Sequence, residues 1–301
     1  MSRPDDVIAT LRKRNELWTP APGLIALRGE VLSRFRVLEK RVRAVCMRED
    51  VEEWLVAPAL PLDVLQRAGY FASFPQWLTV ASHLADDEPT LERLATSQEP
   101  ARELTTALAA PSAALPPAVC YHVYAALAGR RLDAPIHVTA QGCCWRHEGP
   151  RFAPLERCWA FTMRELVCIG TEEDCLRFAG ESAEIVRALA EELEVPFTIE
   201  VAEDPFFAPT SRGRALLQRV KALKHELRLA VDSDRTIAAA SINVHERFFG
   251  DAFDIRASDG QPAFTACLAF GLERWLLAAL VHDVSSLAPN RAEPLVLELA
   301  P

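Results

Sequence analysis

Residues 145–148 read Trp-Arg-His-Glu, and residues 157–170 read Arg-Cys-Trp-Ala-Phe-Thr-Met-Arg-Glu-Leu-Val-Cys-Ile-Gly. The eight residues between them, 149–156, include one glycine and two prolines, which interrupt strand pairing and mark a turn. The whole stretch is therefore predicted to form a β-hairpin. This hairpin is unusual because charged residues interrupt arms that otherwise have the composition of core strands.

One face of the second arm combines apolar side chains with a carboxylate. Alternate side chains of a strand share a face. The positions on this face are Trp159, Phe161, Met163, Glu165, Val167 and Ile169. A buried carboxylate such as Glu165 needs a cation, a metal ion or a proton. Arg146 and Glu148 share a face of the first arm, and Arg157 opens the second. Such a platform could stack a flat ring on Phe161 while its arginines hold an anion.

Length and composition are those of a soluble globular protein. The 301 residues are 50% hydrophobic and 25% charged, which allows one large domain or two ordinary ones. The N-terminal residues are charged and lack the apolar core of a signal peptide. No apolar run approaches the roughly 20 residues of a membrane helix. We therefore expect a cytoplasmic protein without a membrane partner.

The eight cysteines and the net charge of −9 narrow the possible chemistry. No two cysteines form a Cys-x-x-Cys pair, so reduced thiols are expected rather than a disulfide framework. Taken singly, each cysteine is expected to be a small buried hydrophobe. The acidic balance argues against a broad nucleic-acid surface, which requires a basic excess.

Helix-like and strand-like segments follow one another without repeats or low-complexity linkers. The expected helices lie over residues 5–50, most of 51–110 with a break at 69–75, 121–129, the residues after a capping Thr171, and the end of the stretch 266–279. The expected strands, besides the hairpin, are 197–202, 221–231 and 238–244. Without βαβ alternation or a Gly-x-Gly-x-x-Gly motif, the predicted class is α+β, an antiparallel sheet flanked by helices.

A dense basic cluster lies in the first helical region and comprises Arg34, Arg36, Lys40, Arg41, Arg43 and Arg48. It has two interpretations. The favoured one is the solvated face of an amphipathic helix, and the alternative is a docking patch for an acidic protein partner. If the cluster is a docking patch, changing its residues should affect only a reaction step that involves the partner. If it is a solvated helix face, no reaction step should be affected.

Two segments resemble motifs of class II aminoacyl-tRNA synthetases. The hairpin residues Arg146, Glu148, Arg157, Phe161 and Glu165 resemble motif 2, and Phe270-Gly-Leu-Glu-Arg resembles motif 3. The chain is most similar to the amino acid:[carrier protein] ligases, which are truncated homologues of the atypical seryl-tRNA synthetases. In that group, zinc ligands fall at the positions of Cys120, Glu165 and Cys267.

Segments 69–75 and 241–245 also resemble sequence of this family. The resemblance implies one class II synthetase-like catalytic domain over residues 1–301. Its mostly helical N-terminal part would be residues 1–64, and its catalytic core would be residues 65–280.

The resemblance also implies a two-step, ATP-dependent reaction. A small amino acid of the glycine or alanine class and ATP give an aminoacyl-adenylate, and the aminoacyl group then passes to the phosphopantetheine thiol of a carrier protein. The implied cofactors are Zn²⁺ and Mg²⁺ with ATP, and the implied assembly is a homodimer without a tRNA partner. Zinc with three protein ligands keeps its fourth tetrahedral position open, which in this family takes the amino group of the amino acid.

Residue roles follow from the same resemblance. Arg146 would bridge the α-phosphate of ATP and the carboxylate of the amino acid, where preorganised arginines stabilise developing charge. The other implied contacts are Glu148 to the adenine amino group, Arg157 to the phosphate tail, Phe161 stacked on adenine, Arg274 to the outer phosphate, and Glu165 beside the amino acid. Further expected nucleotide or substrate contacts are Cys158, Lys224, Ser241 and Asn243. Arg146 and Arg274 are the expected catalytic residues.

One departure from the family pattern concerns magnesium. Seryl-tRNA synthetases carry an acidic magnesium ligand just before the strand that bears the Ser and Asn. Here residues 236–240 read Thr-Ile-Ala-Ala-Ala, without an acid. The ATP phosphates, or another acid such as Glu226, would then hold the ion.

Two alternative functions remain open. A seryl-type tRNA synthetase would need a tRNA-binding module, and no long heptad arm precedes the catalytic region of this acidic chain. A catalytically inactive, zinc-binding regulatory paralogue would not be expected to keep Arg146, Phe161, Glu165 and Arg274. Taken alone, Glu165 could be a core carboxylate paired with an arginine, and Arg274 could cap a helix.

Overall fold

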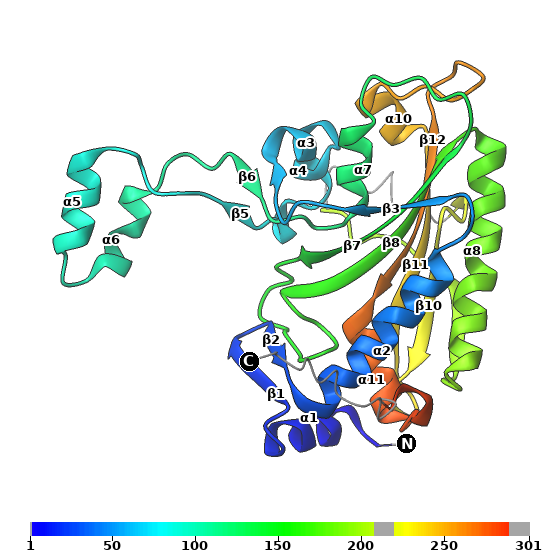
Figure 1. Ribbon diagram of the computed structural model, residues 1–301, viewed down its shortest axis with the longest axis horizontal. Coiled ribbons are helices and arrows are strands. Elements are labelled where there is room, and N and C mark those ends of the chain that lie inside the picture. Colours follow the sequence, from blue (N-terminus) through cyan, green and yellow to red (C-terminus); the bar gives the residue numbers. More distant parts are fainter. Residues whose placement is uncertain (1, 208–219, 289–301) are drawn as a thin grey trace, which may run out of the picture.

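The computed structural model describes residues 2–207 and 220–288 (Figure 1). Its centre is a seven-stranded sheet in the order β3-β7-β8-β12-β11-β10-β9. The strands are β3 (Val51–Leu55), β7 (Ile136–Trp145), β8 (Ala160–Gly170), β12 (Phe264–Gly271), β11 (Thr236–Glu246), β10 (Lys224–Ala230) and β9 (Phe197–Val201). Neighbouring strands are antiparallel, except that the edge strand β3 runs parallel to β7.

Strands β7 and β8 form the predicted hairpin, paired from Ile136 with Ile169 to Trp145 with Ala160. Because β7 ends at Trp145, Arg146 and Glu148 follow the strand and do not lie on its face, which corrects the prediction. The backbone N–H of Arg146 makes one more bond, to the carbonyl of Trp159 at 2.9 Å. Regular pairing stops there because the glycine and prolines of 149–156 cannot continue the ladder.

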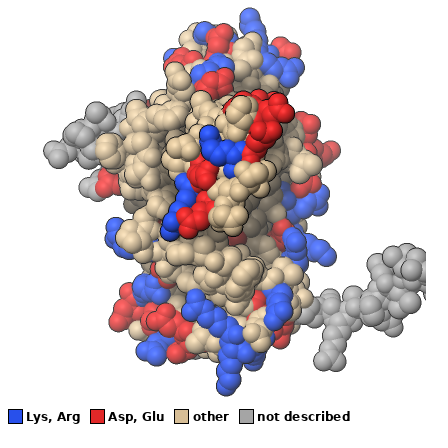
Figure 2. Space-filling view, turned by 90° about the vertical axis from the view of Figure 1, so that its left-hand side faces the viewer, with Lys and Arg blue, Asp and Glu red and all other residues tan. Residues whose placement is uncertain are grey.

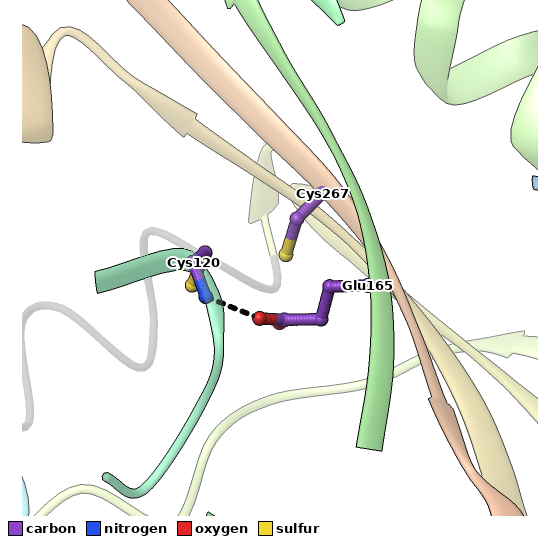
Figure 3. Close-up of side chains that lie close together, drawn as sticks. All are labelled: Cys120, Glu165 and Cys267. Atoms are coloured by element: carbon purple, nitrogen blue, oxygen red, sulfur yellow. Dashed lines mark hydrogen bonds between the residues drawn. The ribbon is translucent and has the colours of Figure 1, made fainter. Parts of the chain in front are cut away.

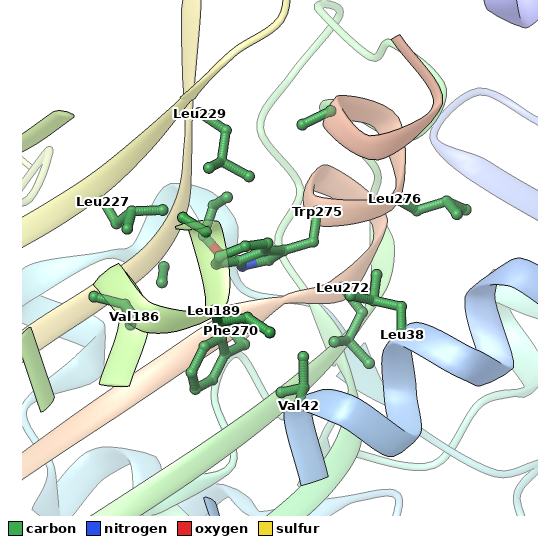
Figure 4. Packing of buried hydrophobic residues seen from close by; sticks show 14 of the residues in the cluster. Leu38, Val42, Val186, Leu189, Leu227, Leu229, Phe270, Leu272, Trp275 and Leu276 are labelled. Atoms are coloured by element: carbon green, nitrogen blue, oxygen red, sulfur yellow. The ribbon is translucent and has the colours of Figure 1, made fainter. Parts of the chain in front are cut away.

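Helices cover both faces of the sheet. One face carries α2 (Gly29–Cys46), α8 (Glu172–Glu192) and α11 (Leu272–Val281), and the other carries α3 (Leu62–Arg67), α4 (Tyr70–Ser73), α7 (Cys120–Ala126) and α10 (Phe248–Phe253). Trp275 lies at the centre of the first layer (Figure 4). Cys168 of β8 packs into this first layer and Val167 into the second, as strand alternation predicts.

The N-terminal part is only partly helical. α1 (Pro4–Lys13) is followed by a hairpin of β1 (Leu17–Ala21) and β2 (Leu24–Leu27), and only then by α2. The helix expected over 5–50 is therefore wrong at residues 17–27, where two prolines and Gly23 oppose helical geometry. Gly23 has a φ of +77°, and a Cβ there would lie 2.7 Å from the Trp159 side chain.

Two strands of the sheet were not predicted. Residues 51–55 were expected to be helical but form β3, because they pair with β7 across the sheet. Residues 264–271 form β12, which occupies the first half of the stretch expected to pass into a helix. β12 is buried along nearly its whole length, and a continuous apolar run of this kind has no periodicity that separates a buried strand from a buried helix.

An arm projects from the body of the molecule (Figure 1). It consists of α5 (Glu88–Thr96) and α6 (Pro100–Ala107), which confirms helices in this part of 51–110. The arm joins the body through a small sheet of β4 (Leu60–Pro61), β6 (Ala113–Ala114) and β5 (Val80–Ala81). Two short 3-10 helices complete the described elements: η1 (Pro75–Trp77), which precedes β5, and η2 (Ser285–Leu287), which follows α11.

Helix α8 begins where the sequence predicts it. Thr171 accepts a hydrogen bond from the Asp174 N–H, and the Asp174 carboxylate accepts one from the Thr171 N–H, which together form a capping box. Over residues 2–207 and 220–288, no helix combines the length and the apolar character required to cross a membrane. The division into residues 1–64 and 65–280 stays a prediction.

Candidate active site

Two cysteines and a carboxylate from three separate elements meet on the α7 side of the sheet (Figure 3). Cys120 is the first residue of α7, Glu165 lies on β8, and Cys267 lies on the neighbouring strand β12. Cys267 pairs with Val167, two residues from Glu165, so Glu165 and Cys267 share one face of the sheet. The three ligand atoms lie within 4.8 Å of one another, and the three residues are 5%, 2% and 3% exposed.

Burial perturbs the ionisation of this cluster. Desolvation, with the nearby Cys267 sulfur, raises the pKa of Glu165 to about 8, although its carboxylate accepts a hydrogen bond from the Cys120 N–H. The hydrogen bond between the two thiols raises the pKa of Cys120 and lowers that of Cys267. A buried carboxylate beside a thiolate is stable only with a cation, and two sulfurs with one oxygen are donors that suit Zn²⁺.

Strand β11 supplies polar neighbours to Cys267. Asn243 is its cross-strand partner, and the Asn243 Nδ2 lies 3.5 Å from the Cys267 Sγ and 3.2 Å from the Ser241 Oγ. The Nε2 of His245 lies 3.9 Å from the same sulfur, while its Nδ1 lies 3.1 Å from the Thr265 Oγ1. Donors of this kind orient a metal ligand. The structure thus brings the predicted Ser241 and Asn243 to the cluster of Cys120, Glu165 and Cys267, and adds His245, which had no role predicted from the sequence.

A cavity of about 100 Å³ lies between the hairpin, β11 and the start of α11. Its lining includes most of the expected nucleotide contacts, namely Arg146, Glu148, Cys158, Phe161, Lys224, Ser241 and Arg274. Arg157 does not line this cavity but forms an ion pair with Glu148 at 3.1 Å. Folding therefore collects these residues around one space, although they are spread over more than 120 positions of the chain.

Arg274 and its neighbour Glu273 are both fixed by backbone groups. Arg274 donates from Nε to the Glu156 carbonyl at 2.7 Å and from Nη1 to the Ala238 carbonyl at 2.8 Å, and burial lowers its pKa. The two Glu273 carboxylate oxygens accept from the Thr162 N–H at 2.8 and 2.9 Å. Burial raises the pKa of Glu273 to about 7. Glu273 was not assigned from the sequence, although it lies inside the segment that resembles motif 3.

Arg146 lines this small cavity and also a larger one. Its Nε donates to the Pro117 carbonyl at 3.0 Å, and its guanidinium carbon lies 5.5 Å from the ring centroids of both Trp77 and Phe161. The guanidinium thus lies over the ring that is expected to stack on adenine. A base stacked on this side of Phe161 would have to displace it.

Lys224 is the third cation that lines the small cavity, beside Arg146 and Arg274, and it is 7% exposed. Its Nζ lies 2.6 Å from the Asp204 Oδ1 and 3.1 Å from the Glu226 Oε1. Glu226, the acid considered for magnesium, is also 3.3 Å from Arg228. Because two cations already hold Glu226, it would bind magnesium only after these ion pairs rearranged, and the magnesium ligand stays a prediction.

The larger cavity has a volume of about 390 Å³ and includes Cys120, Glu165 and Cys267, the candidate metal cluster, in its lining. Its aromatic lining comprises Tyr70, Phe74, Trp77, Tyr121, Phe206, Phe248 and Phe249. Phe74 stacks on Trp77 and on Phe206 with centroid distances of 5.3 and 5.0 Å. Three of these lining residues, Tyr70, Phe74 and Trp77, lie in or next to segment 69–75, which resembles family sequence but had no predicted role. The signal was the cluster of aromatic residues between a glycine and a proline.

Five of the six residues of the basic cluster, which lies on α2 except for Arg48 just beyond it, form ion pairs with acids. Its ion pairs are Arg34–Glu30, Arg36–Glu39, Arg41–Glu192, Arg43–Glu53 and Arg48–Glu181. On the side of the molecule shown in Figure 2, basic and acidic residues are likewise interspersed. The ion pairs favour the interpretation of the cluster as a solvated helix face over a docking patch.

Comparison with known proteins gives relatives of two kinds, amino acid–[acyl-carrier-protein] ligases and type-2 serine–tRNA ligases. No model of a protein family matches the sequence. Amino acid–[acyl-carrier-protein] ligases 1 and 2 of Bradyrhizobium diazoefficiens are each 32% identical to the chain. The two matches cover 75% and 86% of this chain, and 69% and 77% of those proteins. The type-2 serine–tRNA ligase of Methanocaldococcus jannaschii is 27% identical over 88% of this chain, but the chain covers only 52% of it.

Two solved structures show the same fold. M. kandleri SerRS, in its complex with A. aeolicus tRNASec, superposes with a TM-score of 0.82 over 96% of this chain and 60% of its own, at 24% identity. Giardia lamblia prolyl-tRNA synthetase, in complex with prolyl-adenylate, gives a TM-score of 0.65 over 92% of this chain and 52% of its own, at 13% identity. These neighbours confirm the predicted α+β fold of class II synthetases.

The two ligases show to which family the chain belongs, because it covers more than two thirds of each of them at 32% identity. The fold is the one that the resemblance implied. The chain therefore belongs to the family of the amino acid–[acyl-carrier-protein] ligases, built on the fold of class II aminoacyl-tRNA synthetases.

Proposed function

We propose that this protein activates a small amino acid with ATP, as an aminoacyl-adenylate, and transfers the aminoacyl group to the phosphopantetheine thiol of a carrier protein. The family supports the general reaction, since both ligases are named for joining an amino acid to an acyl-carrier protein. The observation that carries the proposal is the position of Arg146 in the lining of both cavities. A phosphate in the small cavity and a carboxylate in the large one would meet at its guanidinium.

In the first step, the carboxylate of the amino acid attacks the α-phosphorus of ATP, and pyrophosphate leaves. Negative charge concentrates at the phosphoryl oxygens, and buried, backbone-anchored arginines stabilise such charge without further reorganisation. Arg146 and Arg274 fill this role, because both are held by hydrogen bonds to carbonyl oxygens. Phe161 and Glu148 would hold the adenine, and Arg157 the phosphate tail. Positioning and charge suffice here, so no general base is required.

Specificity for an amino acid would come from the metal cluster. Cys120, Glu165 and Cys267 would hold Zn²⁺, which supplies an open coordination position for the substrate amino group. The carboxylate end of the same substrate would then point toward Arg146, since both the cluster and Arg146 line the large cavity. Lys224, Ser241, Asn243 and Cys158 complete the proposed contacts. Mg²⁺ would enter with ATP.

In the second step, the thiol sulfur attacks the carbonyl carbon of the adenylate, a thioester forms and AMP leaves. The large cavity leaves a volume of about 390 Å³ beside Cys120, Glu165 and Cys267, which is enough for the end of a flexible pantetheine arm. The net charge of −9 disfavours tRNA as the acceptor. We further propose that the protein acts as a homodimer in the cytoplasm.

The test is amino-acid-dependent exchange of pyrophosphate into ATP, measured across all twenty amino acids. We expect exchange with glycine or alanine, and none with large side chains. A matched control is Arg256→Ala, because Arg256 is an exposed arginine whose partner is Asp254 at 2.9 Å. Exchange should survive Arg256→Ala and fail in Arg146→Ala. If no amino acid supports exchange by the wild-type protein, it is an inactive paralogue and the proposal is wrong.

A further inference from the structure

A second pair of cysteines lies on the opposite face of the sheet from the metal cluster. Cys168 is on β8, three residues after Glu165, and packs into the layer of α2, α8 and α11. Cys175 lies near the start of α8. Their Sγ atoms are 3.9 Å apart, and neither residue is exposed. Nothing in the proposed reaction uses either thiol.

A histidine and a carboxylate continue from this pair toward the surface. His137 is the direct cross-strand partner of Cys168, so the two side chains lie side by side on the same face. The His137 Nδ1 lies 2.8 Å from the Asp50 Oδ2, and its ring stacks on Phe178 at 6.0 Å. Asp50 fixes the orientation of the imidazole and favours its protonated form. The result is a thiol, an imidazole and a carboxylate in series.

The two thiols are not equivalent. Cys175 donates its S–H toward the Cys168 sulfur. This hydrogen bond, together with the neighbouring His137, lowers the pKa of Cys168 to about 6, whereas the same contact raises the pKa of Cys175. Of the two, Cys168 is therefore the thiol that is favoured as a thiolate, and Cys175 is its hydrogen-bond donor. A thiolate beside a histidine has the character of a reactive cysteine, in contrast to an inert buried one.

A cavity lies next to His137, on the surface side of this pair; neither cysteine lines it, so a small molecule would have to pass the His137 ring to reach Cys168. The cavity has a volume of about 200 Å³ and is lined by Arg48, Asp50, His137, Asp174, Arg177, Phe178 and Glu181. It is polar and large enough for a molecule the size of a few waters. Among the described residues, only Cys120, Glu165 and Cys267 are arranged as a metal site. Cys168 and Cys175 are therefore considered as a pair of thiols and not as metal ligands.

We propose that Cys168 and Cys175 are a modification site that hydrogen peroxide converts to a reversible disulfide. The Cys168 thiolate attacks one peroxide oxygen; an S–O bond forms, the O–O bond breaks, and the departing hydroxide takes the proton held by His137 and leaves as water. The Cys175 sulfur then attacks the oxidised Cys168 sulfur. An S–S bond forms, the S–O bond breaks, and a second water leaves with the Cys175 proton. The balance is two thiols and one peroxide to one disulfide and two waters.

Bond formation requires a small local movement. The sulfurs must close from 3.9 Å to about 2.05 Å, which side-chain rotation and a shift in the first turn of α8 can supply. The new bond would tie that turn to β8. Glu165 points to the opposite face of the same strand, so the metal cluster should remain intact. Reduction by a small thiol such as glutathione would restore both cysteines.

The sequence makes the test direct. Trypsin cleaves after Arg164 and Arg177 and releases residues 165–177, a peptide that contains Cys168 and Cys175 and no other cysteine. The full-length, zinc-saturated protein is treated with limiting peroxide, and remaining thiols are blocked after denaturation. We expect this peptide to lose two hydrogens and to carry no blocking group. Cys143 is the control because it is exposed to solvent. Partial desolvation of its thiol raises its pKa, so it should stay a thiol during peroxide treatment and still be alkylated.

Variants assign the two roles. In Cys175→Ser, Cys168 should stop at the sulfenic acid and be trapped by dimedone, and in Cys168→Ser, Cys175 should stay reduced. His137→Phe keeps a ring against Phe178 and should slow the cross-link about ten-fold or more, because it removes the imidazole that favours the Cys168 thiolate and supplies the proton to the departing hydroxide. The proposal is overturned if peroxide oxidises Cys143 while residues 165–177 remain fully alkylated. It is equally overturned if the cross-link joins Cys120 and Cys267 instead.

Discussion

Replacement of Arg146 by alanine is the perturbation whose consequences the contacts define most fully. The substitution removes the hydrogen bond to the Pro117 carbonyl and the guanidinium that lies 5.5 Å from both Trp77 and Phe161. It also removes a cation from the boundary between the two cavities. Both the phosphate and the carboxylate of the proposed adenylate would lose their shared partner.

The magnitude follows from the number and kind of these contacts. Loss of one preorganised donor to a developing anion typically costs about 10²–10³-fold in rate, or about 2.7–4 kcal/mol. Because Arg146 faces both reacting groups, we expect a value toward the larger end of that range. The two cation–π contacts contribute about 1 kcal/mol at such partly buried sites, and their loss affects stability more than catalysis. Arg146→Lys keeps the charge but not the planar fork, so we expect it to recover little of the rate.

The assay is pyrophosphate exchange at saturating ATP, with zinc content and thermal unfolding measured on the same samples. Zinc is included because the charge of Arg146 also lowers the pKa of Glu165, so its removal could weaken the metal site. We expect exchange to fall while the fold is kept. A lysine variant with near-normal exchange, or an alanine variant within about three-fold of wild type, would refute the assigned role of this arginine.

Three further predictions address other parts of the site. Cys267→Ser should lose both bound zinc and amino acid activation, whereas Cys46→Ser, at a buried thiol in the opposite layer, should keep both in metal analysis and exchange. Burial raises the pKa of Glu273 from 4.5 to about 7, so its contribution to stability is complete below pH 4.5 and is lost as pH rises through 7. Urea unfolding should therefore show Glu273→Gln gaining up to about 3 kcal/mol on wild type between pH 4.5 and pH 8, and an unchanged difference would contradict this. Arg43→Glu replaces an exposed ion pair with Glu53 by two like charges, so we expect a modest loss of stability and unchanged aminoacyl transfer. A selective loss of transfer would instead support the interpretation of the basic cluster as a docking patch.

The parts of the site that the sequence could predict are those encoded by short-range patterns. Strand alternation places Glu165 and Val167 on the face opposite Cys168, and the structure confirms it. The capping signals at Thr171 correctly mark the start of α8. Cys120 and Cys267 are far apart in the chain and entered only through the family resemblance. Their proximity to Glu165 depends on the pairing of β8 with β12.

The remaining features depend on tertiary contacts that no local pattern encodes. β12 shows no alternation of apolar and polar residues because it is buried along nearly its whole length. β3 is a strand because its backbone pairs with that of β7. The position of Arg146 between two cavities follows from the end of β7 at Trp145. The acids that neutralise α2 come in part from distant segments, as Glu192 does for Arg41.

The central claim is that the adenylate formed at Arg146 passes to a carrier-protein thiol, and single-turnover transfer tests it most directly. Enzyme is loaded with labelled glycine or alanine and ATP, freed of excess substrate, and mixed separately with a holo carrier protein, the same carrier without phosphopantetheine, and tRNA. We predict label on the holo carrier alone, as a thioester that hydroxylamine releases, with AMP formed in equal amount. Label on tRNA with none on any holo carrier protein would contradict the account and establish a tRNA synthetase instead.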